Sequence, residues 1–234
     1  MDCHISLNRT HCVDHIVEQE NHVFIEQAKV VLKRDKYACQ FCGFRHTKYQ
    51  QVITRNHQYT NNDFKADNMV TVCPFCFLGQ RLGHAVLGGK ISFIYLPELS
   101  QADLNHLQRI LYYYIDKPDV DTNDDFELTA QQQSLRDCKQ MAESLGMELQ
   151  MRTKKVKQVF HHLKLDRLEP LATLLFQNSE ADYQKRHRFF EPIRYLVNPE
   201  LVKTFNDIYK EDVFVKLDGY KEILSSAQVL SREV

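Results

Sequence analysis

Two short cysteine motifs constrain this chain more than any other feature of its sequence. Cys39 and Cys42 form one Cys-x-x-Cys knuckle, Cys73 and Cys76 form a second, and thirty residues lie between the two. Each such turn places two sulfurs on one side of a tetrahedral site, so two turns complete the four ligands of structural zinc. Gly43 directly follows the first knuckle, where a turn with positive φ favours glycine. The spacing therefore predicts a zinc ion, Zn²⁺, held by these four cysteines.

Redox chemistry is the other use of a Cys-x-x-Cys motif. A thioredoxin-like motif lies in a βαβ unit, and no such pattern surrounds either knuckle. Four thiolate ligands also leave no coordination position open for a reactive water, which indicates a structural rather than a catalytic metal. Three cysteines remain, and Cys3, Cys12 and Cys138 are expected to be ordinary reduced thiols.

The composition indicates a globular, mostly helical protein of the α+β class. Of 234 residues, 43% are hydrophobic, but only 7 are glycine and 6 are proline, so turns are few. A net charge of −1 excludes a global attraction to nucleic acid or to anionic membranes. The sequence has no apolar run of about 18 residues that could span a bilayer. Its first residues, MDCHISLNRTHC, lack the apolar segment of a signal peptide, so we expect a cytoplasmic protein.

The spacing of apolar residues predicts the elements of the first half. We expect, in order, an edge strand within 1–20, a helix at 22–35, a strand at 49–54 and a buried strand at 91–96.

A further helix is predicted after Pro97. Ser100, with Asp103 three residues later, is a helix N-cap signal. The helix that follows carries an apolar face formed by Leu104, Leu107, Leu111 and Tyr114.

An acidic segment suggests a division into two parts. Residues 117–128 have no apolar period and are predicted to link a knuckle domain at 1–116 to a helical region at 129–234. In that region helices are expected at 129–149, 153–167, 169–178, 180–190 and from Pro199 onward.

The residues between the knuckles resemble the zinc-bound ββα-metal nucleases of the HNH family. The resemblance covers 37–80 and implies an HNH-like ββα zinc-knuckle core, with His57 at the position of the general base and Asn68 at that of the asparagine that orients it. Asn56 stands where the family has a metal-binding aspartate, and Phe77 where it has the last metal ligand. A catalytic divalent ion needs hard, preferably anionic oxygen ligands. These departures predict no catalytic residues and no enzyme activity.

Two further histidines, His46 and His84, flank the knuckles but lie outside ligand spacing. Both are expected to be exposed.

A second resemblance extends beyond the knuckles. Residues 34–44, 49–76 and 94–113 read RDKYACQFCGF, YQQVITRNHQYTNNDFKADNMVTVCPFC and IYLPELSQADLNHLQRILYY. Taken together, these segments are similar to the DotN family, also called IcmJ, of the Dot/Icm type IVB secretion machinery. The resemblance implies a non-catalytic, zinc-stabilised adaptor of the coupling complex, at the cytoplasmic face of the bacterial inner membrane. Its implied partners are the C-terminal tail of a DotL-like coupling ATPase and other coupling-complex subunits, in support of effector translocation.

An extended tail would need a preformed apolar groove. Five residues near the second knuckle and the strand at 91–96 are candidates for lining it: Phe75, Phe77, Leu78, Phe93 and Tyr95. The same residues are equally good candidates for the core, and the sequence leaves both interpretations open.

Two alternatives from other functional classes also stay open. One is an HNH-type metal-dependent endonuclease with an altered site. The other is a nucleic-acid-binding zinc module, since residues 31–95 carry nine Lys and Arg against three Asp. Residues 98–149 have the opposite balance, with eleven acidic against four basic residues.

Overall fold

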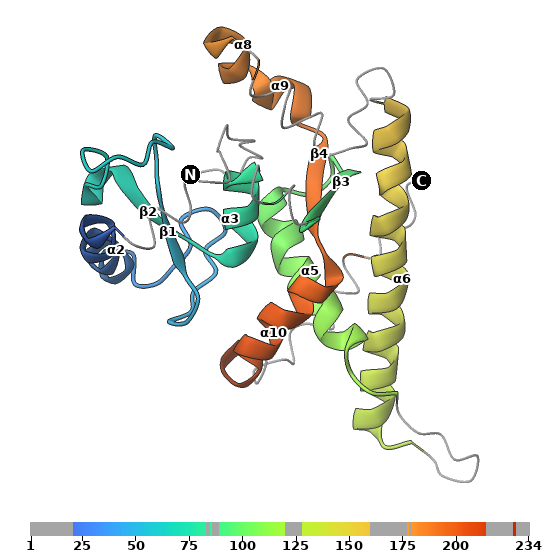
Figure 1. Cartoon of the computed structure of the whole chain (residues 1–234). Helices are drawn as coiled ribbons and strands as arrows, with labels where there is room; N and C mark the ends of the chain where they lie inside the picture. Colours follow the sequence, from blue (N-terminus) through green and yellow to red (C-terminus); the bar gives the residue numbers. More distant parts are fainter. Residues whose placement is uncertain are drawn as a thin grey trace.

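A computed structural model of the chain describes residues 21–82, 85, 89–119, 128–159, 177, 179–213 and 227 (Figure 1). Most of these residues are helical, and two small antiparallel sheets complete the fold, which confirms the α+β class. The elements are α2 (His22–Arg34), β1 (Gln51–Thr54), η1 (Ala66–Asn68), β2 (Met69–Val72), α3 (Pro74–Gln80), β3 (Ile91–Tyr95), α5 (Gln101–Ile115), α6 (Ala130–Val159), α8 (Glu180–Gln184), α9 (Arg186–Phe190), β4 (Ile193–Val197) and α10 (Pro199–Val213). None of the described helices combines the length and the apolar character needed to cross a bilayer.

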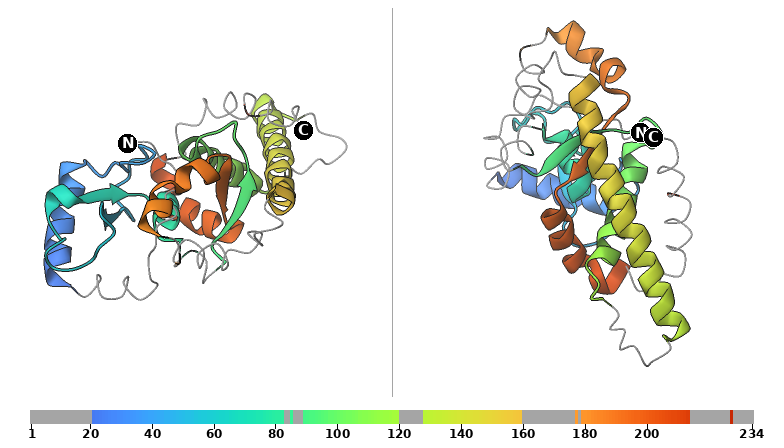
Figure 2. Two further views of the ribbon diagram at one scale, coloured as in Figure 1. Left: turned by 90° about the horizontal axis from the view of Figure 1, so that it is seen from above. Right: turned by 90° about the vertical axis from the view of Figure 1, so that its right-hand side faces the viewer.

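These elements lie in a row. α2, β1 and β2 occupy one end, α5, β3 and β4 lie in the middle, and α6 flanks the other side (Figures 1 and 2). The second view of Figure 2 shows α6 running along most of the long dimension of the molecule.

The predicted helix at 22–35 is confirmed as α2, and it is fastened to the first sheet at its C-terminal end. Its buried Val31 packs into a small core with β1 and β2. Arg34 donates to the carbonyl of Met69 at 2.8 Å, and the carboxylate of Asp35 accepts from the N–H of Thr71 at 2.9 Å. These contacts fix the strand that leads directly into the second knuckle.

The predicted strand at 49–54 is present as β1 and pairs with β2. The antiparallel register runs from Gln51 opposite Val72 to Thr54 opposite Met69. β2 is followed at once by α3, whose seven residues are all buried. The two strands and the helix thus occur in the order that a ββα core requires.

The second sheet joins distant parts of the chain. The predicted strand at 91–96 is confirmed as β3, and its partner β4 is a strand that the sequence did not predict. The outer edge of β4 is satisfied by side chains of α5 instead of by a third strand. Gln101 accepts from the N–H of Tyr195 at 2.9 Å and donates to its carbonyl at 3.0 Å, and Gln108 accepts from the N–H of Val197 at 2.7 Å.

α5 begins as predicted, because the hydroxyl of Ser100 accepts from the N–H of Asp103 at 3.1 Å. Its opposite faces are both covered, so α5 is a central helix rather than a surface one. The predicted apolar face is buried in one core cluster, through Leu104, Leu107, Leu111 and Tyr114.

Two predicted boundaries in the C-terminal half were wrong. The helices predicted at 129–149 and 153–167 are, as far as residue 159, one continuous helix, α6, because no glycine or proline interrupts the residues between them. The segment at 180–190 is instead divided at Lys185 into α8 and α9. The strand predicted within 1–20 and nearly all of the helix predicted at 169–178 lie outside the described residues.

Cores are shared across the segment at 117–128. Residues of the knuckle region and of β4 and α10 belong to one cluster, and α6 packs on α5 and β3. Gly79 of α3 allows a close approach, because a Cβ there would lie 2.6 Å from a ring carbon of Tyr195. The domain boundary stays a prediction, but the described residues on its two sides form continuous packing.

Gln101 is expected to stabilise the protein through its two hydrogen bonds to the edge of β4. We expect Gln101→Leu to destabilise the protein by about 1–3 kcal/mol for each orphaned backbone group of Tyr195, since both groups are buried. The exposed Gln140 of α6 offers a matched control, and Gln140→Leu should change the unfolding free energy by less than about 0.5 kcal/mol. Urea unfolding of the three proteins measures the difference, and equal midpoints would contradict this role for Gln101.

Candidate metal centre

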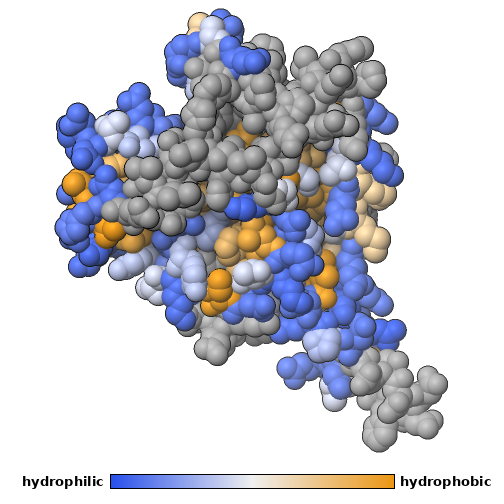
Figure 3. Space-filling model, viewed as in Figure 1, coloured by the Kyte–Doolittle hydropathy of each residue, from blue (hydrophilic) through white to orange (hydrophobic). Residues whose placement is uncertain are grey.

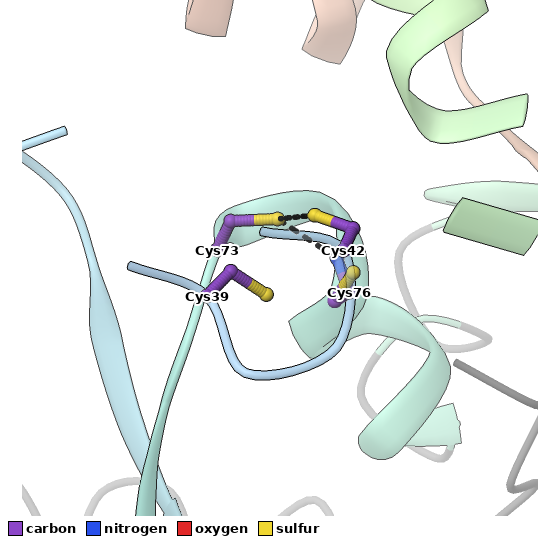
Figure 4. A group of neighbouring side chains, drawn as sticks. All are labelled: Cys39, Cys42, Cys73 and Cys76. Carbon is purple, nitrogen blue, oxygen red and sulfur yellow. Dashed lines mark hydrogen bonds between the residues drawn. The ribbon is translucent and has the colours of Figure 1, made fainter. Parts of the chain in front are cut away.

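The four knuckle cysteines converge on one point. Cys39, Cys42, Cys73 and Cys76 have all their sulfurs within 4.8 Å of one another, and Figure 4 shows the sulfurs gathered between the two knuckles. The sulfurs of Cys42 and Cys73 are 3.6 Å apart. Four sulfurs at about 2.3 Å from a central ion in a tetrahedron would lie about 3.8 Å apart. The group therefore has the donor atoms and the dimensions of a tetrahedral metal site.

The first knuckle is a tight turn bound to the first sheet. Gly43 has φ of +76°, and its N–H donates to the carbonyl of Cys39 at 2.9 Å. The N–H of Cys39 donates to the carbonyl of Phe44 at 2.8 Å. Gln40 then donates through its N–H to the carbonyl of Thr71 on β2 at 2.9 Å. This contact sets the first pair of sulfurs beside the second.

The second knuckle is the N-terminus of α3. Cys73 is the N-cap residue, Pro74 occupies the first turn, and the N–H of Cys76 points to the sulfur of Cys73 at 3.5 Å. A helix N-terminus favours a negatively charged group. The strand-to-helix junction thus presents both sulfurs and stabilises them as thiolates.

Helix α5 closes the site from outside. The side-chain amide of Asn105 donates to the sulfur of Cys76 at 3.2 Å, and Arg109 donates to the sulfur of Cys73 at 3.1 Å. The ring of His106 lies 2.8 Å from the carbonyl of Cys42. These residues hold the groups that a metal ion would use, without being ligands themselves.

The electrostatics favour a thiolate at Cys73, whereas hydrogen bonds with Cys39 and Cys73 raise the pKa of Cys42. Burial disfavours a charged Cys73, but hydrogen bonds from the neighbouring thiols and the charge of Arg109 hold the pKa of Cys73 well below its usual range. Burial also acts against the charge of Arg109, yet the thiolates of Cys73, Cys42 and Cys76 raise the pKa of Arg109. Each charge stabilises the other, as expected for a metal-binding cage.

Asn56 and Asn68, which the HNH resemblance places at nuclease positions, are hydrogen-bonded to each other and to Asp63. Asn68 donates to the side-chain oxygen of Asn56 at 3.0 Å and to the carbonyl of Asp63 at 2.9 Å. Asn56 in turn donates to the carboxylate of Asp63 at 2.9 Å, and its oxygen also accepts from the N–H of Gln58 at 3.2 Å. These side chains therefore bond to one another across the loop between β1 and β2.

His57 lies beside this turn with an unusual backbone and a suppressed charge. Its φ is +57°, and within the described residues its Nδ1 is buried without a hydrogen-bond partner. Burial, together with the charges of Arg186 and Arg81, lowers the pKa of His57 to about 4. The ring is therefore neutral at pH 7.

Most of the predicted partner-binding residues lie in the core. Phe75, Phe77, Leu78 and Phe93 are at most 7% exposed, and all belong to the largest cluster of buried residues. Tyr95 is half-buried at its edge. Of the two interpretations left open by the sequence, burial favours the core for the first four.

One histidine prediction was wrong. His46 is 6% exposed rather than on the surface, and its Nδ1 accepts from the N–H of Lys48 at 2.9 Å. Its ring lies nearly parallel to that of the buried Phe44, with the ring centres 6.4 Å apart and the planes 12° apart. His84 lies outside the described residues.

The contacts of α5 with the cage were not predicted. The usable signal is a second stripe on that helix, with polar residues at positions 101, 105, 108 and 109 that recur at the same helical spacing as the leucines. A polar stripe is ordinarily solvent-exposed, but all four of these residues are buried.

Part of the chain is similar to a known protein of a type 4 apparatus. No family model matches the chain. Over 85 residues it is 44% identical to the type 4 apparatus protein DotN of Legionella pneumophila. The match covers 35% of this chain and 38% of DotN, so the chain spans less than half the length of that relative. The resemblance to DotN is confirmed over this stretch.

Only the four clustered cysteines are expected to be needed for metal binding. Purified protein is expected to hold one tightly bound metal ion per chain, and Cys73→Ser should lose it because three sulfurs leave the site incomplete. Cys138 is equally buried but lies outside the cage, so Cys138→Ser should keep the ion. Elemental analysis after gel filtration measures the content. Full metal in the Cys73→Ser protein would contradict the assignment.

His57 predicts a dependence of stability on pH. Its folded pKa of about 4 lies below the usual 6.5, so the unfolded chain binds the proton more readily. Stability is therefore complete above pH 6.5 and falls as the pH drops through the window down to about 4. We expect the unfolding free energy of the wild type, relative to His57→Gln, to fall by about 2 kcal/mol between pH 7 and pH 5. Comparing the two proteins at each pH cancels any acid-driven loss of metal. A constant difference would rule out the buried, neutral state of His57.

Proposed function

We propose that this chain is a non-catalytic, zinc-stabilised adaptor subunit of a type IVB secretion coupling complex. The observation that carries the proposal is the 44% identity with the type 4 apparatus protein DotN. The proposed location is the cytoplasmic face of the bacterial inner membrane. The proposed partners are the C-terminal tail of a DotL-like coupling ATPase and the other subunits of that complex.

Zinc is the proposed metal. Tetrahedral sites with four sulfur donors select zinc or iron, and zinc is the usual choice where the metal has only a structural role. Its task here would be to stabilise residues 37–80, which contain two short strands, the three-residue η1 and a seven-residue helix. A small loop-rich region gains stability from a structural metal, because its own core is small.

The side chains found at the positions of the nuclease metal ligands support a non-catalytic role. The order β1, β2, α3 is compatible with an HNH-like scaffold. The amide of Asn56, at the position of a metal-binding aspartate, is taken up by Asn68 and Asp63. Phe77, at the position of the last ligand, is 4% exposed and offers no donor atom. We infer that no second, catalytic metal binds beside His57.

The proposed docking site for the tail shifts from the predicted groove to the exposed side of α6. Met147 and Met151 are 63% and 53% exposed and lie one turn apart. Beside them is a cavity of about 350 Å³ lined by Met151, Lys154 and Lys155, and also by Glu98 and Glu148, whose charges are paired with Arg152. The ammonium group of Lys155 also lies 5.1 Å from the ring centre of Tyr95, the one predicted partner residue that stays accessible. An extended segment with apolar anchors and acidic neighbours fits this chemistry.

Other large hydrophobic side chains are exposed among the described residues, on α2 and at Tyr49, but no cavity is found beside them there. On the face drawn in Figure 3 the described residues are mainly hydrophilic, and the apolar ones form separate small patches. Exposed methionines are adaptable apolar contacts, which supports α6 as the docking element.

Binding to the tail tests the proposed surface. We expect Met151→Glu to weaken binding of a DotL-like tail fragment at least tenfold, because it places a charge at the apolar anchor and repels acidic neighbours. Val30 of α2 is also 53% exposed, so Val30→Glu is the matched control and should bind normally. Calorimetric titration of metal-loaded proteins measures both. Equal binding by the two variants, whether normal or weakened, would count against this surface.

The two alternatives give different results in the same preparation. A nuclease would cut plasmid DNA with Mg²⁺ or Mn²⁺ and lose this activity in His57→Ala. A nucleic-acid-binding module would shift DNA in a manner that weakens steeply with salt. The adaptor should do neither, and it should co-purify with the coupling ATPase from native membranes. Absence of that complex would overturn the proposal.

A further inference from the structure

Arg109 is a buried cation whose contacts converge on the metal centre. It is 3% exposed, and it donates to the sulfur of Cys73 at 3.1 Å and to the carbonyl of Asn105 at 3.1 Å. In the part of the chain that the structure describes, no carboxylate pairs with it. The thiolates are therefore the anions that face this guanidinium.

Two aromatic rings hold the guanidinium in place. Its central carbon lies 4.2 Å from the ring centre of Phe44 and 4.1 Å from that of Phe75. Phe44 closes the first knuckle and Phe75 lies inside the second. Cation–π contact with both rings fixes the charge between the two cysteine pairs.

Charge balance explains why such a residue is stable there. A buried ion is costly unless a partner of opposite charge faces it. A divalent ion with four thiolate ligands carries a net charge of −2, whereas four protonated thiols carry none. Arg109 therefore faces more negative charge when the cage holds its metal than when the cage is empty.

We infer that Arg109 is the counter-ion of the metal centre, and that through it metal binding is coupled to the packing of α5 and α10. The inference rests on the proposed metal, but it does not depend on the role in secretion.

Hydrogen bonds connect the cysteine cluster through α5 to β4 and to α10. Asn105, which donates to Cys76, also accepts from Gln101 at 2.9 Å, and Gln101 satisfies the edge of β4. On the other side, Asn206 of α10 donates to the backbone carbonyl of Arg109 at 3.0 Å. A shift of α5 would therefore disturb both the bonds of Gln101 to β4 and the bond of Asn206 to the carbonyl of Arg109.

Replacement of the charge tests the inference. We expect Arg109→Met to weaken zinc binding 10- to 100-fold in competition with a chromophoric chelator, the usual range for residues that support metal ligands. Arg109→Lys keeps the charge but loses the planar fork, and its affinity should lie between the two. Arg152 is another buried arginine, paired with Glu98 at 2.9 Å, so Arg152→Met is the control and should keep full zinc affinity. Unchanged affinity in Arg109→Met would overturn the inference.

Thermal unfolding separates a counter-ion from an arginine that is merely structural. Arg109→Met should lower the melting temperature of zinc-loaded protein more than that of metal-free protein, because the empty cage carries less negative charge for the guanidinium to face. Arg152→Met should lower both. Equal losses for Arg109→Met in both forms would contradict the assignment. If the metal-free protein does not fold, the affinity measurement still decides.

Hydrogen exchange tests the coupling. Removal of zinc by a chelator should reduce protection in 101–115 and 199–208 as well as in 37–80. A loss confined to 37–80 would show that the metal acts only on the knuckles. Neither result depends on the tail of a coupling ATPase, so failure here and failure of the proposed function can be told apart.

Discussion

The contact of a buried arginine with a cluster of four cysteine sulfurs is the interaction on which the rest of this structure depends. Two knuckles bring the sulfurs together, but their charge would be unstable in a dry interior without a cation. Arg109 supplies that cation from α5, a helix that lies outside the metal region in sequence. The metal region and the helical region are therefore joined by electrostatics as well as by packing.

α5 has a second role of the same kind. Within the described part of the chain the two sheets have two strands each, and isolated two-stranded sheets are marginally stable in water. The glutamines of α5 provide β4 with the hydrogen bonds that a third strand would otherwise supply. One helix thus satisfies the sulfurs of the cage through one set of polar side chains and a sheet edge through another.

The loop between β1 and β2 is held together by its own polar side chains. The turn after β1 is held by amide-to-amide and amide-to-carboxylate hydrogen bonds of Asn56, Asn68 and Asp63. Groups that are occupied in this way stabilise the loop, and they offer a divalent ion no anionic ligand pair. His57 is kept neutral by burial and by two arginines, so it adds no charge to the loop at neutral pH.

Local features were determined by the sequence alone. The cysteine pairs, the cap at Ser100, the apolar faces of α2 and α5 and the strand that becomes β3 all follow from spacings of a few residues, because the interactions behind them are made within one turn or one strand. Only the tertiary structure decided that a strand at 193–197 exists, that α6 is unbroken, that His46 is buried and that a polar stripe of α5 is buried, with two of its residues against the cysteine cluster. The physical reason is that a short strand, a buried imidazole or a buried guanidinium is stable only with partners far away in the chain, and the spacing of residues along a sequence carries no record of those partners.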